Sequence, residues 1–155
     1  MSKPINFNLS AELASQLKTS TRKCFERAYE AALLTKGCSY VQGFLVLAKE
    51  PYIPIEYSWL ELDEAVIDPT PNHFKKPTEE PHYFPAQSLS VKKLKAVVEE
   101  AKEDYPDDPP LPVYGNAPYE YYGEVMLGGK EYQDAYEQAL AKCQELKQQK
   151  VNEAN

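Results

Sequence analysis

The chain has 155 residues, of which 43% are hydrophobic and 26% are charged, so it can form one domain with a hydrophobic core. Its net charge of −7 at pH 7 opposes binding to the phosphate backbone of nucleic acids. No apolar run approaches the roughly 20 residues that span a membrane, and residues 1–9 lack the basic and apolar parts of a signal peptide. Together with three cysteines that cannot all pair in one chain, this predicts a cytoplasmic protein with reduced thiols.

The first half of the chain predicts helices followed by a small sheet. Residues 10–34 have helical periodicity, interrupted at Thr19-Ser20-Thr21, where three hydroxyl side chains favour a cap. With Thr21 as the cap, Cys24 takes the third position of the second helix. Strands follow over residues 38–49, 53–62 and 65–68, and their short connections favour antiparallel pairing.

The second half predicts a loop, two helices and a long crossover between them. Residues 69–82 form a polar, proline-rich loop, after which Tyr83-Phe84-Pro85 touches the sheet. The remaining segments are a helix over 90–104, a Pro- and Tyr-rich crossover over 105–129, a helix over 130–151 and a frayed tail over 152–155. The chain is therefore predicted to be a single α+β domain over residues 1–151, with N-terminal helices, a small antiparallel sheet and two later helices packed on it.

Three residues in the first half indicate a possible thiol chemistry. Cys24 near a helix N-terminus, with Arg22 and Lys23 beside it, is the kind of thiol whose pKa is lowered. Asp68, at the end of the third strand, could orient a base or donor as the third member of a triad. Between them Tyr57 stands where such a triad needs a histidine, and a phenol with a pKa of about 10 starts as a proton donor. The alternative is structural: a buried thiol, a core ring and a strand-ending carboxylate.

Histidines and metal-site patterns are sparse. The two histidines, His73 and His82, lie in the predicted 69–82 loop, from which either could fold back toward Cys24 and supply a base. The cysteines and histidines lack the spacing of metal ligands, so the sequence predicts no metal site and no cofactor. The carboxylates around the short strands are interpreted as solvated edge charge.

Four short motifs resemble those of a known group of proteins. They are Tyr40-Val41-Gln42-Gly43, Pro54-Ile55-Glu56-Tyr57-Ser58-Trp59-Leu60, Ile67-Asp68-Pro69-Thr70 and Tyr83-Phe84. With Cys24 on an early helix, this order resembles uncharacterised bacterial and phage proteins that have a transglutaminase- and papain-like core. The resemblance covers residues 20–98 and implies a triad of helix cysteine, strand histidine and strand aspartate. Cys24 and Asp68 match that triad, whereas Tyr57 replaces the histidine.

Tyrosine is concentrated in and after the crossover. Six of the twelve tyrosines lie within residues 114–136, among glycines, prolines and acidic side chains. Tyrosine provides a broad contact area at a low entropy cost, which suits protein interfaces. The alternative is that these rings cover the sheet. The predicted binding residues are Tyr40, Trp59, Tyr114, Tyr119, Tyr121 and Tyr122.

These patterns favour one function and leave two alternatives. The favoured hypothesis is a cytosolic, non-catalytic protein that binds a protein partner and is built on a degenerate thiol-hydrolase-like scaffold. If the protein is an enzyme, Cys24, Tyr57 and Asp68 would serve a cysteine-dependent amidase or acyltransferase. The other alternative is a small-ligand pocket formed by Tyr40, Tyr57, Trp59 and the crossover tyrosines.

Overall fold

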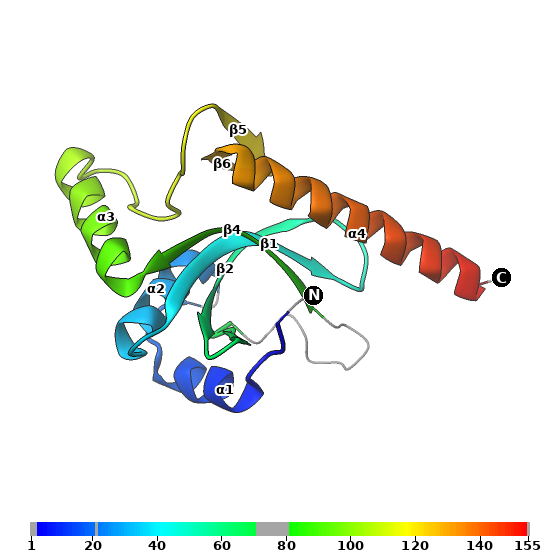
Figure 1. Ribbon diagram of the computed structural model, residues 1–155, viewed down its shortest axis with the longest axis horizontal. Helices are drawn as coiled ribbons and strands as arrows, with labels where there is room; N and C mark the ends of the chain where they lie inside the picture. The colour runs from blue at the N-terminus through cyan, green and yellow to red at the C-terminus, as the bar shows by residue number, and fades with distance from the viewer. Residues whose placement is uncertain (1–2, 21, 71–80, 155) are drawn as a thin grey trace.

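The computed structural model describes residues 3–20, 22–70 and 81–154, and at its centre is an antiparallel sheet flanked by helices (Figure 1). It confirms the predicted α+β class. In chain order the elements are α1 (Phe7–Gln16), α2 (Cys24–Leu34), β1 (Ser39–Leu47), β2 (Ile55–Leu62), β3 (Ala65–Ile67), β4 (Pro81–Ser90), α3 (Val91–Asp104), β5 (Tyr119–Tyr122), β6 (Val125–Gly128) and α4 (Lys130–Ala154). Within the described residues, no helix combines the length and apolarity needed to cross a membrane.

The strand order β3-β2-β1-β4 places β1 inside the sheet, with antiparallel neighbours on both sides. This position explains why nearly all of its residues are buried, since an internal strand can be covered on both faces. Side chains alternate along the strand. Val41 and Leu45 pack with Trp59 on one face, and Phe44 and Val46 pack on the other.

Separate hydrophobic clusters cover the two faces of the sheet. On the face of Tyr40 and Phe44, α2 and α3 pack at one end, and α4 packs at the other end with the β5–β6 hairpin. Figure 1 shows α4 lying along one side of the sheet, with α2 and α3 gathered at the end away from the C-terminus. The opposite face carries the aromatic side chains of Tyr57, Trp59 and Tyr83.

α1 begins three residues earlier than the sequence predicted. The Asn6 side chain caps it by accepting a hydrogen bond from the Leu9 N–H at 3.0 Å, so the helix starts at Phe7. Ser10, the predicted start, is instead a buried residue inside the helix. The predicted interruption is confirmed, because α1 ends at Gln16 and the next helix begins beyond it.

α2 also begins at a different position from the one predicted. Cys24 is its first residue and not its third, and the preceding Lys23 makes no side-chain cap hydrogen bond. The predicted cap, Thr21, lies outside the described residues. On α2 the Arg27 side chain is buried, whereas Leu33, near the end of the helix, is 46% exposed.

β4 is a full strand where the sequence predicted only a short contact with the sheet. Pro81 and His82, assigned to the 69–82 loop, are its first residues, and pairing with β1 continues to Ser90. Residues 71–80 of that predicted loop lie outside the described residues. The strand was missed because its residues do not alternate cleanly between apolar and polar, and the long register with β1 is a non-local contact.

A break in the β1–β4 register lies at the glycine of the first motif. The pairing shifts between Gln42 and Gly43, where the backbones of the two strands come close together. A Cβ atom on Gly43 would lie 2.1 Å from the carbonyl oxygen of Phe84, so a side chain cannot fit without moving β4. Pro85, opposite Gly43, is tolerated because β4 is the edge strand.

The predicted crossover over 105–129 contains a β-hairpin that the sequence did not indicate. β5 and β6 pair antiparallel and end just before α4. The hairpin is anchored by Tyr122, whose ring meets Phe44 of β1 edge-to-face with centroids 5.6 Å apart. The segment over 105–118 is irregular, as its prolines predicted.

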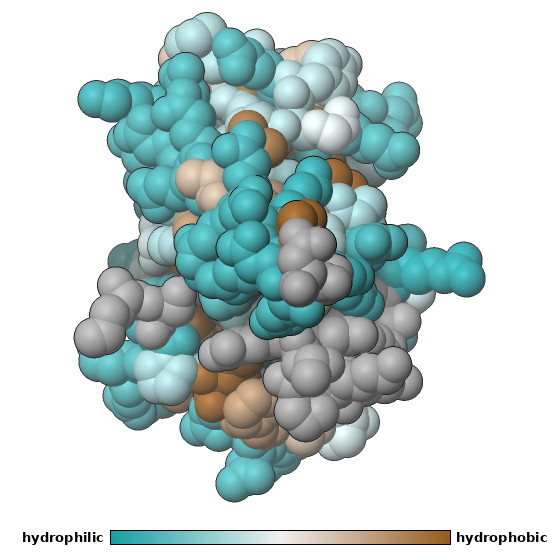
Figure 2. Space-filling model, turned by 90° about the vertical axis from the view of Figure 1, so that its right-hand side faces the viewer, coloured by the Kyte–Doolittle hydropathy of each residue, from teal (hydrophilic) through white to brown (hydrophobic). Residues whose placement is uncertain are grey.

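α4 extends past the predicted end of the last helix. Residues 152–154, predicted as part of a frayed tail, continue the helix. Along α4, Leu140 is 36% exposed. Figure 2 looks onto the end of the molecule where α4 finishes and shows a mainly hydrophilic surface with small hydrophobic patches. The face of α4 that packs on the sheet includes the buried residues Tyr132, Ala135, Ala139 and Cys143.

Candidate functional site

Asp68 lies at the end of β3 and is fully buried. Its Oδ1 accepts a hydrogen bond from the Tyr57 hydroxyl at 2.8 Å and from the Thr70 N–H at 2.9 Å. Its Oδ2 accepts a hydrogen bond from the Tyr83 hydroxyl at 2.6 Å. The structure therefore brings Tyr57 and Asp68 together and adds Tyr83, whose role the sequence did not indicate.

Burial determines the protonation of this cluster. It raises the pKa of Asp68 to about 6, although the hydrogen bonds from Tyr83, Thr70 and Tyr57 and the charge of Arg27 act in the opposite direction. Burial and the neighbouring Asp68 raise the pKa of Tyr57 well above 10. Tyr57 is thus held as a proton donor to Asp68, and it does not act as the base that histidine provides in a triad.

Cys24 lies against the part of β2 that β3 does not reach. Within β2, β3 pairs with Leu60–Leu62, and the Cys24 thiol donates a hydrogen bond to the Glu56 carbonyl nearer the start of β2, with an Sγ–O distance of 3.9 Å. The side chain packs against the cluster that contains Tyr57. Burial raises the pKa of Cys24 to about 12, and the charges of Asp68 and Glu26 raise it further. The lowering of the Cys24 pKa that a helix N-terminus would cause is therefore outweighed by the burial of the thiol.

Within the described residues, no histidine is placed beside Cys24 to supply the missing base. His82 lies on β4, opposite Val46, and β4 is on the other side of β1 from β2. Val46 packs on the face of the sheet opposite Tyr57 and Cys24, so the side chain of His82, which pairs with Val46, points away from Cys24. His73 lies outside the described residues.

Arg27 is a buried charged side chain that the sequence pattern did not single out. Its guanidinium donates hydrogen bonds to the carbonyl oxygens of Thr19, at 2.6 Å, and of Pro69. It also donates to the Thr70 hydroxyl at 3.3 Å. Arg27 thus ties the segment after β3 to the chain before α2. The available signal was its position on α2 beside Ala28 and Ala31, on the apolar face.

The predicted binding residues divide into core and surface groups. Tyr40 and Trp59 have no exposed surface and lie on opposite faces of the sheet, so they do not line a common pocket with Tyr57. Tyr122 is 5% exposed and packs beside Tyr136, with ring centroids 4.9 Å apart. The remaining three are on the surface: Tyr114, Tyr119 and Tyr121 are 50%, 49% and 68% exposed.

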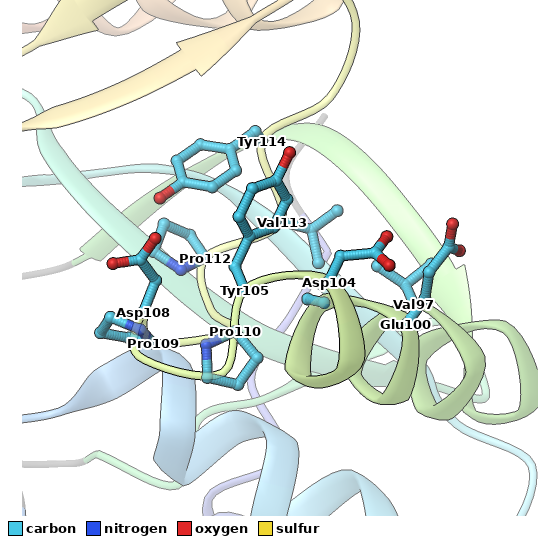
Figure 3. Close-up of a pocket in the computed structure, with 11 residues that line it drawn as sticks. Val97, Glu100, Asp104, Tyr105, Asp108, Pro109, Pro110, Pro112, Val113 and Tyr114 are labelled. Carbon is cyan, nitrogen blue, oxygen red and sulfur yellow. The ribbon is translucent and has the colours of Figure 1, made fainter.

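A groove lies between the C-terminal end of α3 and the proline-rich segment (Figure 3). We call it the Tyr105/Tyr114 groove. In Figure 3 these two rings rise from its wall, with Asp108 to one side and Asp104 and Glu100 to the other. Its volume is about 250 Å³. Its lining residues are Val97, Glu100, Ala101, Asp104, Tyr105, Asp108, Pro109, Pro110, Pro112, Val113 and Tyr114.

Gln42 holds one wall of this groove to the sheet. Its buried Oε1 accepts hydrogen bonds from the Val113 N–H at 2.8 Å and from the Tyr40 hydroxyl at 2.9 Å. Its Nε2 donates to the Val113 carbonyl at 2.8 Å and to the Tyr132 hydroxyl at 2.6 Å. Both backbone groups of Val113 are thereby satisfied from β1, which fixes the crossover at that residue.

A second fixed point follows at Tyr114 and Gly115. The Tyr114 carbonyl accepts a hydrogen bond from the Gly128 N–H at 2.8 Å, and Gly115 forms an isolated parallel bridge with Gly128. Gly115 has φ +84°, and a Cβ atom there would lie 2.4 Å from the Gly128 carbonyl oxygen. Glycine is required here for both reasons, and the Tyr114 side chain is directed outward from a rigid backbone.

No protein-family model, no curated protein and no solved structure matches the chain. The fold and the site therefore define the protein only as an α+β domain with a buried Tyr–Asp–Tyr cluster on one face and an acidic, tyrosine-bearing surface beside the other. Its function has to be argued from these residues.

Proposed function

We propose that this protein is a cytosolic, non-catalytic binding protein whose contact surface is formed by the crossover. We call this the acidic tyrosine surface. It consists of exposed tyrosines and carboxylates between α3 and α4. Its members are Asp104, Tyr105, Asp107, Asp108, Tyr114, Tyr119, Glu120, Tyr121 and Glu124.

The observation that carries the proposal is the exposure of four tyrosine rings in one acidic segment of the chain. Tyr105 and Tyr121 are 66% and 68% exposed, and Tyr114 and Tyr119 are about half exposed. Rings that cover a sheet lose their exposure on folding, as Tyr122 does. Rings left in solvent provide a broad contact area, and a tyrosine side chain has few rotatable bonds to order on binding, which is how tyrosine serves interfaces.

The chemistry of Cys24 supports the non-catalytic part of the proposal. A thiol nucleophile needs a lowered pKa and a base within hydrogen-bond reach. Cys24 has a pKa raised to about 12 and donates to a backbone carbonyl. The proximity of Tyr57 and Asp68 favours a cysteine-dependent amidase or acyltransferase as the second candidate, on a scaffold that resembles thiol hydrolases.

Selection from a displayed library of random 12-residue peptides tests the binding function. Peptides enriched on the wild-type protein are expected to lose binding to the triple variant Tyr114→Ala/Tyr119→Ala/Tyr121→Ala. The matched control is Leu34→Ala/Ile53→Ala/Val151→Ala, which removes three comparably exposed hydrophobic side chains elsewhere. Peptides that bind the wild type and the first variant equally well would contradict the proposal.

A further inference from the structure

Resting on that function, we propose that the Tyr105/Tyr114 groove is the part of the surface that binds an arginine side chain from an extended segment of the partner protein. The groove has an apolar floor of prolines and Val113, and two exposed tyrosine rings rise from its wall (Figure 3). Its volume of about 250 Å³ is below the roughly 300–1,000 Å³ of pockets that enclose small molecules. It therefore fits one long side chain better than a free cofactor.

The negative charge around the groove favours a positively charged side chain as its ligand. Glu100, Asp104 and Asp108 line it, and none of its lining residues is basic. All three carboxylates are exposed. Residues 103–129 contain six acidic and no basic residues, so no lysine or arginine of this segment neutralises the groove. A cationic side chain entering it would be attracted by charges on both sides of the rings.

The combination of rings and carboxylates favours arginine over lysine. A guanidinium is planar, stacks on the face of a tyrosine ring and donates two parallel hydrogen bonds to a carboxylate. Tyr105 and Tyr114 provide the ring faces, and Asp104 and Asp108 provide the acceptors beside them. An ammonium group is a compact, strongly hydrated charge that uses only part of this arrangement.

The groove is also preorganised. Val113 is held at both backbone groups by Gln42, and the Tyr114 carbonyl is held by the Gly128 N–H. Prolines 109, 110 and 112 restrict the backbone between these points and α3. A site that is already ordered loses little conformational entropy when a side chain enters, so a small groove can still bind measurably.

Fluorescence polarisation with a defined peptide tests the inference. The probe is fluorescein-labelled Gly-Ser-Arg-Gly-Ser-Arg-Gly-Ser-Arg, and the control replaces each arginine with citrulline, which keeps the planar shape and removes the charge. We expect the arginine peptide to bind at least about ten-fold more tightly than the citrulline peptide. Tyr105→Ala and Tyr114→Ala should each weaken binding about five-fold, and Asp104→Asn/Asp108→Asn about ten-fold.

Matched variants separate the groove from the rest of the surface. Val151→Ala and Glu153→Gln change an exposed apolar side chain and an exposed carboxylate at the C-terminal end of α4, outside the acidic tyrosine surface, and should leave affinity unchanged within about two-fold. Tyr114→Phe keeps the ring and should retain binding. Circular dichroism of each variant verifies folding, which is expected to be unaffected because Tyr105 and Tyr114 are exposed.

Several outcomes would overturn the inference. They are equal binding of the two peptides, unchanged binding by the folded groove variants, an equal loss in the Val151 and Glu153 controls, or no binding of the arginine peptide up to about 1 mM. If the arginine inference fails, the selection from the peptide library shows whether the proposed binding function also fails. Selected peptides without arginine that still require Tyr119 and Tyr121 would leave the function standing and assign it to the hairpin.

Discussion

Two opposing effects act on the thiol of Cys24. Its place at the start of α2 favours the thiolate, because the helix N-terminus carries a partial positive charge. Burial favours the neutral thiol and is the larger effect, and Glu26 in the first turn adds a repelling charge. Position along a helix is visible in the sequence, but the solvent accessibility that decides the pKa is not.

The rate of Cys24 alkylation follows from its raised pKa of about 12. At pH 8 we expect iodoacetamide to label Cys24 in the folded protein about a thousand-fold more slowly than a free thiol of pKa about 8.5. Mass spectrometry of the digested protein measures the rate, and labelling in denaturant is the control. Fast labelling at pH 6–7 in the folded state would instead support the enzyme hypothesis.

Asp68 shows the same competition with a carboxylate. Three hydrogen bonds stabilise its charged form, yet burial raises its pKa from 3.8 to about 6. Because the folded state then binds the proton more tightly than the unfolded state, the contribution of Asp68 to stability is greatest below pH 3.8. That contribution is lost as the pH rises through about 6.

Comparison with Asp68→Asn isolates this effect, because asparagine keeps an oxygen acceptor and does not ionise. Between pH 4 and pH 7.5 we expect the free energy of unfolding of the wild type to fall relative to the variant by about 2 kcal/mol. Urea unfolding at several pH values measures the difference. A difference that rises with pH would mean that the tyrosine hydrogen bonds outweigh burial.

At the scale of elements, the position of the crossover depends on a few hydrogen bonds between residues that are far apart in the chain. Gln42 of β1 meets Val113, which is 71 residues away in the chain, and it meets Tyr132 of α4, 90 residues away. These hydrogen bonds replace the regular ladder that a proline-rich segment cannot form. One side chain of the sheet therefore fixes a wall of the groove.

Replacing Gln42 with leucine should loosen that wall. Gln42→Leu leaves the Val113 N–H and carbonyl and the Tyr40 hydroxyl without this partner, and we expect a loss of about 3 kcal/mol in the free energy of unfolding. Chymotrypsin should then cut more rapidly at Tyr114. Gln87→Leu is the control: Gln87 is half-buried and accepts one hydrogen bond from Tyr132, so it should cost less than about 1 kcal/mol. Equal losses in the two variants would contradict this role of Gln42.

Two glycines with the same backbone conformation distinguish the cost of a positive φ from the cost of a steric clash at the Cβ position. Gly115 and Gly37 have φ +84° and +82°, but a Cβ on Gly37 would meet only the Leu62 side chain, at 3.9 Å. Gly37→Ala should cost about 1 kcal/mol, and Gly115→Ala about 3 kcal/mol, because its Cβ would collide with the Gly128 carbonyl. Urea midpoints measure both. A similar cost at the two positions would show that the hairpin moves freely to accommodate the methyl group.

At the scale of the whole molecule, the hydrophobic clusters share one strand. β1 contributes Tyr40 to the cluster with α2 and α3, Phe44 to the cluster with α4, and Leu45 to the aromatic face. Loss of β1 would expose all three clusters at once. The chain should therefore behave as one cooperative unit.

Unfolding is expected to be two-state by independent probes. Trp59 is the single tryptophan, is fully buried and reports on the aromatic face, whereas far-ultraviolet circular dichroism is dominated by the helices on the opposite side. The urea transitions followed by fluorescence and by dichroism should coincide. A dichroism change that precedes the loss of Trp59 fluorescence would show that α4 and the hairpin unfold separately.

Features that depend on local pattern were predictable from the sequence. The strand residues Ile55, Tyr57 and Trp59 alternate in the sequence and share one face in the structure. The helix start at Ser90 follows from a short-range capping preference, since the Ser90 hydroxyl accepts the Lys93 N–H at 3.2 Å. The α+β class follows from the order of such elements.

Features that depend on contacts between distant residues were decided only by the tertiary structure. β4 is stabilised by pairing with β1, a strand some 40 residues earlier in the chain. The β5–β6 hairpin is held against the sheet by the contact between the Tyr122 and Phe44 rings. The sequence by itself placed a thiol, a phenol, a carboxylate and a row of tyrosines. Whether each is buried or exposed depends on what folds over it, and burial determines which of them ionise, which are core and which remain free to bind.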